Sequence, residues 1–196
     1  MVIMLENLKK YHIILASNSP RRKELLSGLD IDFSVKVVPG VEETYPDSLG
    51  KEDIPLYISR EKAAAYLSDM SDDDLIITAD TIVWIDGQVL GKPKDEEDAA
   101  KMLQQLSGKT HEVITGVTLT TSSFQRSFST VSEVKFAHLT KEEIDFYVAR
   151  YRPMDKAGAY GVQEWIGYVG VENIKGSFYN IMGLPVQRLY NELKKL

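Results

Sequence analysis

The apolar segment Asp74–Gly91, which reads DLIITADTIVWIDGQVLG, limits the fold of this chain more than any other stretch. Two strand-like runs meet within it at Thr78–Thr81, and the dipeptide Asp86-Gly87 is typical of a tight turn between antiparallel strands. The segment therefore predicts two apolar strands followed by a hairpin.

Shorter strand-like runs and amphipathic helices flank this segment along the chain. Strands are expected over Ile13–Ala16, Ile31–Val38, His111–Thr121 and Gln125–Leu139. Helices are expected from Pro20 onward, over Ile54–Leu67, Lys94–Gly108 and Leu139–Pro153, and over Met182–Leu196. The irregular alternation of strands and helices, without repeats or Pro/Gly-rich linkers, predicts one α/β unit, in one lobe or two.

The composition excludes several classes of protein. The 196 residues carry a net charge of −6, which argues against broad nucleic-acid binding. The absence of cysteine excludes disulfides, thiolate catalysis and cysteine metal sites. The N-terminal residues lack the apolar core of a signal peptide, and no window is apolar enough to span a membrane. We therefore expect a cytoplasmic protein with no nucleic-acid or membrane partner.

The segment LASNSPRRKELL, Leu15–Leu26, contains an electrostatic misfit. Ser19 suits the N-cap position and Pro20 the first helical position. Arg21 and Arg22 are then cations at the positive end of a helix dipole, which costs about 0.3–1 kcal/mol per charge when nothing offsets it. A site for an anion is one explanation of this placement.

Two later helices of the same chain begin with acids instead. Asp95–Asp98 crowd the start of one helix, and Glu142 and Glu143 begin another, with Thr140 and Glu143 in the spacing of a capping box. Because the chain follows the dipole rule there, the exception at the two arginines marks a place to look for function.

Two interpretations of the arginines stay open from the pattern alone. Guanidinium groups at a helix N-terminus match phosphate oxygens, and Ser17, Asn18 and Ser19 add further donors. Alternatively, both side chains point to solvent or pair with Glu24 or with acids elsewhere.

Asp80 is a second candidate, because a carboxylate among apolar strand residues needs a partner, a hydrogen bond or a metal ion. It also fits a strand-end aspartate that bonds to the local backbone. Glu42 and Glu43 add carboxylates in a loop. Mg²⁺ requires only one or two protein carboxylates when substrate phosphates complete its shell.

Seven segments, taken together and in this order, resemble the Maf-like family of nucleoside triphosphate pyrophosphatases. They are LASNSPRRKELL, VEE, REKA, TADTIV, LGKPKDEEDAAKMLQQLSGKTHEVITGV, DKAGAYGVQ and KGSFYNIMGLP, which together run from about Ile13 to the final helix. Each segment is a weak signal, and the combination is highly specific.

The resemblance implies an α/β fold like that of inosine triphosphate pyrophosphatases, with a long mixed β-sheet flanked by helices. We expect residues 1–196 to form a single Maf-like domain, bilobal, with a central nucleotide cleft. The implied activity is hydrolysis of a nucleoside triphosphate to the monophosphate and pyrophosphate with a divalent metal cation, Mg²⁺ or Mn²⁺. The PRR and DKAGAYGVQ segments resemble the branch that acts on dTTP and UTP. The family is also linked to septum formation and to homodimers.

The family's functional residues can be matched to positions of this sequence. Asp80 matches the proton-accepting aspartate, and Glu43 matches the acid that helps to hold the metal. The residues around the triphosphate are matched by Ser17, Arg21, Arg22, Lys62 and Lys92. Positions tied to base selection are matched by Thr81, Gln163 and one arginine, Arg21 foremost. Whether Asp80 serves as base, metal ligand or both stays open.

One departure from the family pattern bears on the substrate. After Gln163 the chain reads EWIGYVG, where many relatives have a Gly-rich run, so Glu164 and Trp165 are candidates for narrowing the base pocket. Two alternatives to the dTTP/UTP activity stay open. One is a non-hydrolytic nucleotide-binding regulator of septum formation and cell division, and the other is a house-cleaning enzyme for modified nucleotides.

Overall fold

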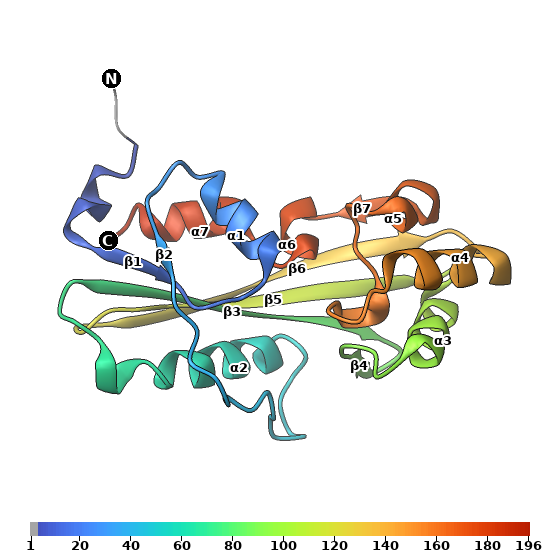
Figure 1. Cartoon of the computed structure of the whole chain (residues 1–196), viewed down its shortest axis with the longest axis horizontal. Helices are drawn as coiled ribbons and strands as arrows, with labels where there is room; N and C mark the ends of the chain where they lie inside the picture. Colours follow the sequence, from blue (N-terminus) through green and yellow to red (C-terminus); the bar gives the residue numbers. More distant parts are fainter. Residues whose placement is uncertain (1–3) are drawn as a thin grey trace. The chain divides into compact units, whose positions relative to one another are not determined.

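The computed structural model of the chain describes residues 4–196 (Figure 1). These residues form two compact units. The first comprises the residues up to Asp80, Thr115–Thr130 and Gly183–Leu196, and the second comprises Thr81–Ile114 and Val131–Met182.

Seven strands of residues 4–196 form a mixed sheet in the order β2-β1-β3-β5-β6-β7, with β4 paired to β3. The strands are β1 (His12–Leu15), β2 (Ser34–Val35), β3 (Asp74–Ile85), β4 (Gln88–Leu90), β5 (Thr110–Thr120), β6 (Gln125–Phe136) and β7 (Val171–Lys175). β1 pairs in parallel with β2 and β3, whereas β4 pairs antiparallel with β3 and β7 pairs antiparallel with β6. The expected class, an α/β fold with a long mixed sheet flanked by helices, is confirmed.

The helices of the first unit cover both faces of its strands. They are η1 (Glu6–Lys10), α1 (Pro20–Ser27), α2 (Asp53–Ala64), η2 (Leu67–Asp69) and α7 (Val186–Leu193). α1 and α7 lie on one face and α2 lies on the other (Figure 1). Between strands and helices, Ile14, Tyr66 and Ile76 pack together as a buried apolar cluster.

The second unit contains the remaining helices of the described chain. They are α3 (Glu96–Leu106), α4 (Lys141–Tyr151), η3 (Ala157–Ala159), α5 (Trp165–Gly170) and α6 (Phe178–Met182). α3 packs against α4 and η3. The Asp95 carboxylate caps α3, and Thr140 and Glu143 form the capping box that their spacing predicts.

Four local predictions about elements were wrong. The strand expected over Ile31–Val38 is limited to Ser34–Val35. β3 is one continuous strand rather than two runs, because the polar side chains at its middle, Thr78 and Asp80, are buried and hydrogen-bonded. α2 ends at Ala64, and Leu67 is exposed. The C-terminal helix expected from Met182 begins only at Val186, because Gly183 takes a φ of +112°.

The hairpin prediction at the end of β3 is confirmed. Asp86 and Gly87 take φ values of 50° and 81°, which suit the two central residues of a type I′ turn. Among residues 4–196, no helix is both long enough and apolar enough to cross a bilayer.

A buried aromatic cluster in the second unit contains an ionisable ring. His111 lies edge to face against Phe136 and Tyr160, with ring centroids 5.1 and 5.4 Å away. Its Nε2 is 2.7 Å from the Tyr160 hydroxyl, and its Nδ1 has no hydrogen-bond partner. Burial lowers the pKa of His111 to about 4, so the ring is neutral in the folded chain near neutral pH.

This burial predicts an acid-sensitive component of stability. Between the unfolded pKa of about 6.5 and the folded value of about 4, the unfolded chain binds more protons than the folded chain. The free energy of unfolding therefore falls as the pH falls through that window, by about 3 kcal/mol in total from this residue. Urea unfolding of the wild type and of His111→Gln, which cannot titrate, measures the difference in slope. Equal slopes for the two proteins would contradict the assignment.

Candidate functional site

The turn before α1 is organised by two serine hydroxyls. The Ser19 hydroxyl accepts a hydrogen bond from the Arg22 backbone N–H, as expected of an N-cap, with Pro20 at the first helical position. The buried Ser17 hydroxyl accepts one from the Ser19 N–H at 3.2 Å. Together these bonds fix where the helix starts and therefore where its arginines project.

The Arg22 side chain turns inward rather than toward solvent. Its Nε donates to the carbonyl of Gly183 at 2.8 Å, and its Nη1 donates to the carbonyl of Ala79 at 2.9 Å. The solvent-facing interpretation is therefore wrong for Arg22. Burial lowers the pKa of its guanidinium and Arg21 acts in the same direction, while the neighbouring carboxylates Asp80 and Glu43 oppose the shift. Arg21 itself is half-buried.

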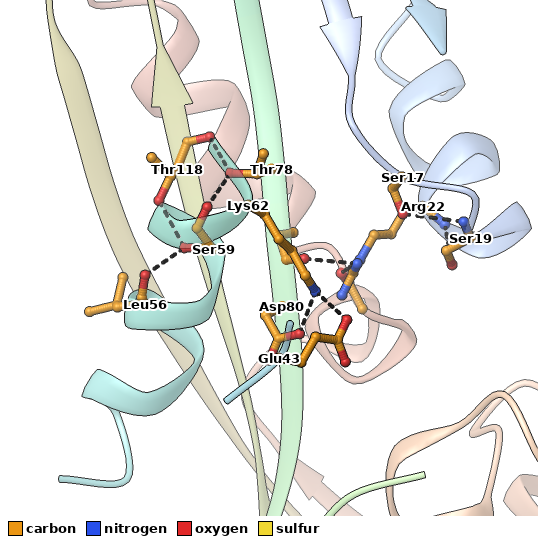
Figure 2. Close-up of polar contacts among 12 residues, drawn as sticks. Ser17, Ser19, Arg22, Glu43, Leu56, Ser59, Lys62, Thr78, Asp80 and Thr118 are labelled. Carbon is orange, nitrogen blue, oxygen red and sulfur yellow. Dashed lines mark hydrogen bonds and ion pairs between the residues drawn. The ribbon is translucent and has the colours of Figure 1, made fainter. Parts of the chain in front are cut away.

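Lys62 lies between two carboxylates (Figure 2). Its Nζ is 2.8 Å from Oδ1 of Asp80 and 2.7 Å from Oε1 of Glu43. The side chains of Lys62 and Asp80 are 15% and 10% exposed, whereas that of Glu43 is 45% exposed. The Lys62–Asp80 pair is thus shielded from water, and Glu43 approaches it from the solvent side.

The helix that carries Lys62 is attached to the strands by hydroxyl groups (Figure 2). The Ser59 hydroxyl is 2.8 Å from Oγ1 of Thr118, and Oγ1 of Thr78 donates to the Ser59 carbonyl at 2.7 Å. Ser59 lies one turn before Lys62 on α2, and Thr78 lies two residues before Asp80, on the same face of β3. The hydroxyl contacts therefore fix the helix beside the position where the ion pair forms.

A glycine in β5 allows this close approach. A Cβ at Gly116 would lie 2.4 Å from the carbonyl carbon of Pro55 in α2, far inside van der Waals contact. Any other residue would push α2 away from the strand, and Lys62 with it.

The loop that carries Glu43 is also anchored to the core of the first unit. The Tyr66 hydroxyl accepts from the N–H of Val38 at 3.0 Å and donates to the carbonyl of Lys36 at 2.8 Å. The chain then turns at Gly40, which takes a φ of +79°, before it reaches Glu43.

Three further candidates belong to the second unit. Thr81 is half-buried in β3, and Lys92 is exposed just after β4. Gln163 lies in the turn before α5, where its side-chain oxygen is buried and has no hydrogen-bond partner. A buried carbonyl oxygen without a donor is costly, so this oxygen is a candidate acceptor for a ligand.

The donor set of the first unit fits a small divalent cation. Glu43 and Asp80 direct one oxygen each at the same point, which Lys62 Nζ now occupies. Within residues 4–196, no group of three or more His, Asp or Glu side chains is arranged to hold a metal ion. Two carboxylates suffice for Mg²⁺ when water and phosphate oxygens supply its other ligands.

The first unit therefore brings Ser17, Arg22, Glu43, Lys62 and Asp80 to one region at the start of α1 and the middle of β3 (Figure 2). Cations and carboxylates of this kind can bind a polyanion and accept a proton beside it. Sequence reasoning missed the Ser59–Thr118 and Thr78 hydroxyl contacts. Nothing in the sequence around these residues singles them out, because other polar side chains lie close to each of them.

Known proteins share this sequence over nearly its whole length. Residues 12–196 match the family described as "Maf-like protein". A protein of Phocaeicola vulgatus named dTTP/UTP pyrophosphatase is 70% identical over 193 residues, covering 98% of this chain and all of that protein. A protein of the same name from Bacteroides thetaiotaomicron is 65% identical over the same shares.

Two solved structures share the fold. The Staphylococcus aureus Ham1 protein has a TM-score of 0.55 at 17% identity, covering 94% of this chain and 98% of that one. A HAM1 protein from Coxiella burnetii has a TM-score of 0.50 at 17% identity, covering 95% of this chain and 100% of that one. At this identity the likeness concerns the fold alone.

Proposed function

Because this chain belongs to the Maf-like protein family, we propose that it is a nucleoside triphosphate pyrophosphatase acting on dTTP and UTP. The products are the nucleoside monophosphate and pyrophosphate. The observation that carries the proposal is the cluster of Arg22, Lys62, Asp80 and Glu43, in which a shielded carboxylate lies beside fixed cations.

The residues divide the chemistry between them. Asp80 accepts the proton of the water that attacks the α-phosphorus, since its carboxylate is shielded from bulk water and lies beside the phosphate-binding cations. Arg22, fixed by two carbonyls, and Lys62 bind phosphate oxygens and stabilise the charge that develops on the leaving pyrophosphate. Arg21, Lys92 and Ser17 are proposed to complete the phosphate contacts.

Glu43 and Asp80 are the residues that would hold a divalent cation, Mg²⁺ or Mn²⁺. When bound, such a cation neutralises phosphate charge and makes water more acidic. A cation held there would take the place of Lys62 Nζ between the two carboxylates, and the ammonium would then be available to phosphate oxygens.

Base recognition is assigned to residues of the second unit, Thr81 and Gln163, with Arg21. The buried, unpaired oxygen of Gln163 needs an N–H donor. Thymine and uracil both offer a ring N3–H between two carbonyls, whereas cytosine has no ring N–H on that edge. This supports a preference for dTTP and UTP.

We further propose that residues 1–196 form a single Maf-like domain. The cytoplasm is proposed as the location, because the substrate belongs to the cytoplasmic nucleotide pool. A homodimer is proposed as the assembly, which light scattering can test.

Replacing the proton acceptor tests the proposed function. With Mg²⁺ present, the wild type is expected to release pyrophosphate from dTTP and UTP. Asp80→Asn should lower kcat by about 10²–10⁴-fold, because the amide cannot accept the proton, while nucleotide binding is kept. Pyrophosphate release and calorimetric binding of dTMP measure the two effects.

The matched control is Asp86→Asn, in the exposed Lys109–Asp86 pair, which should keep wild-type rates. A near wild-type rate for Asp80→Asn would remove Asp80 from the chemistry. A wild type that binds nucleotide without releasing pyrophosphate would instead favour the non-hydrolytic regulator. A panel that includes modified triphosphates, ranked by kcat/KM, tests the house-cleaning alternative.

The metal proposal predicts competition between Lys62 and the cation. In Lys62→Met, the carboxylates of Glu43 and Asp80 lose their shared counter-ion, so Mn²⁺ should bind about tenfold more tightly or better. The Tm of the variant without nucleotide should therefore rise more on adding Mn²⁺ than that of the wild type.

Lys101→Met is the control, because Lys101 pairs with Glu97 on the exposed face of α3. It should respond to Mn²⁺ as the wild type does. An equal or smaller Mn²⁺-induced Tm shift in Lys62→Met would contradict the assignment of Glu43 and Asp80 as the metal-holding residues.

A further inference from the structure

Gln163 sits in a four-residue turn of the second unit. The N–H of Glu164 donates to the carbonyl of Gly161 at 3.0 Å, which closes the turn. Val162, within the turn, is buried, and the Gln163 side-chain oxygen is buried without a partner. What holds this turn therefore decides where the Gln163 amide points.

Glu164, the last residue of the turn, does not cap the helix that follows it. Glu164 is the N-cap residue of α5, yet its side chain makes no capping hydrogen bond. Its two carboxylate oxygens instead face Tyr147 of α4 and Lys156. Because the Glu164 carboxylate contacts Tyr147 and Lys156 instead of capping α5, its role differs from that of an ordinary N-cap residue.

Tyr147 connects the two ends of the turn. Its hydroxyl accepts from the N–H of Gly161 at 3.0 Å and donates to Oε2 of Glu164. Burial is the largest cause that raises the pKa of Tyr147, and the hydrogen bond to Glu164 adds to it, so the hydroxyl stays protonated and remains a donor. The ring is fully buried and stacks on Tyr151 with centroids 5.0 Å apart.

Lys156 completes the arrangement with a buried ammonium. Its Nζ lies 3.1 Å from Oε1 of Glu164 and 2.8 Å from Oδ1 of Asp155, and its side chain is 10% exposed. A buried ammonium is tolerated only when carboxylates neutralise it. Glu164 supplies one of these carboxylates, so a displacement of Glu164 would leave the Lys156 ammonium poorly neutralised.

The space around these groups is filled. A Cβ at Gly161 would lie 2.9 Å from Cδ of Glu164 and 3.1 Å from Cε of Lys156. The turn therefore has little room to shift while the three side chains stay in place.

We infer that Tyr147, Lys156 and Glu164 are positioning residues that hold the Gly161–Glu164 turn and thereby set the preference of Gln163 between nucleotide bases. These three side chains are termed the turn clamp. The inference rests on the proposed function, in which Gln163 contacts the base. It assigns the selectivity to residues that act on the turn, and it gives Glu164 this role in place of narrowing the base pocket.

The physical reason lies in the cost of a misplaced acceptor. A rigid, unpaired Gln163 oxygen strengthens the binding of a base with an N–H at that point and weakens the binding of a base without one. If the turn is loosened, the Gln163 amide reorients. The difference in binding affinity between thymine and cytosine then decreases. Phosphate chemistry, which is assigned to other residues, is left intact.

Two mild substitutions test the clamp. Tyr147→Phe removes the hydroxyl that joins the turn ends, and Glu164→Gln keeps the shape but removes the charge that neutralises Lys156. Each should lower the ratio of kcat/KM for dTTP to that for dCTP by about 5–50-fold, mainly through a higher KM for dTTP. The kcat for dTTP should stay within about threefold of the wild type.

Binding of dTMP and dCMP, measured by calorimetry, gives the same preference without turnover. Glu133→Gln is the matched control, because Glu133 pairs with Lys175 at 2.8 Å on the exposed strands of the same unit. It should leave both ratios unchanged. Lys156→Arg should keep more of the preference than Lys156→Met, since only the former retains the charge.

The possible results distinguish a failure of the turn-clamp inference from a failure of the proposed function. Clamp variants that keep the wild-type dTMP-over-dCMP preference, or that lose kcat equally for all nucleotides, would overturn the inference. A wild type that prefers dTMP over dCMP but releases no pyrophosphate would overturn the proposed function alone. In that case the binding ratios of the variants still decide the role of the clamp.

Discussion

The geometry of the first unit depends on one ammonium group held between two carboxylates. Asp80 lies in a buried strand, where an unpaired charge would be strongly destabilising. Lys62 supplies the counter-charge at 2.8 Å and extends it to Glu43. This pairing is available only because α2 lies against the strands, where Gly116 leaves room for its backbone and Ser59 bonds to Thr118.

Arg22 shows how a charge that is unfavourable locally is retained. The helix dipole and Arg21 both oppose it, and burial lowers its pKa. Two carbonyl acceptors and the nearby Asp80 partly offset these costs. A bound polyphosphate would add negative charge beside Arg22, so the proposed function gives a reason for a guanidinium group at this helix N-terminus.

Predictions from the sequence succeeded where the cause is local. The caps at Ser19 and Thr140 and the turn at Asp86 follow from neighbouring residues, and the structure has them. Asp80 could be singled out because a carboxylate stood among apolar residues. The contacts of Ser59 and Tyr147 could not be predicted, since each depends on residues far along the chain that only the fold brings near.

Proton transfer to Asp80 and stabilisation of the leaving pyrophosphate by Arg22 and Lys62 both require that water attacks the α-phosphorus. Turnover of dTTP in water enriched in ¹⁸O, with both products analysed by mass spectrometry, tests this directly. The account predicts one ¹⁸O atom in dTMP and none in pyrophosphate. Label in pyrophosphate, or release of orthophosphate as the first product, would contradict it.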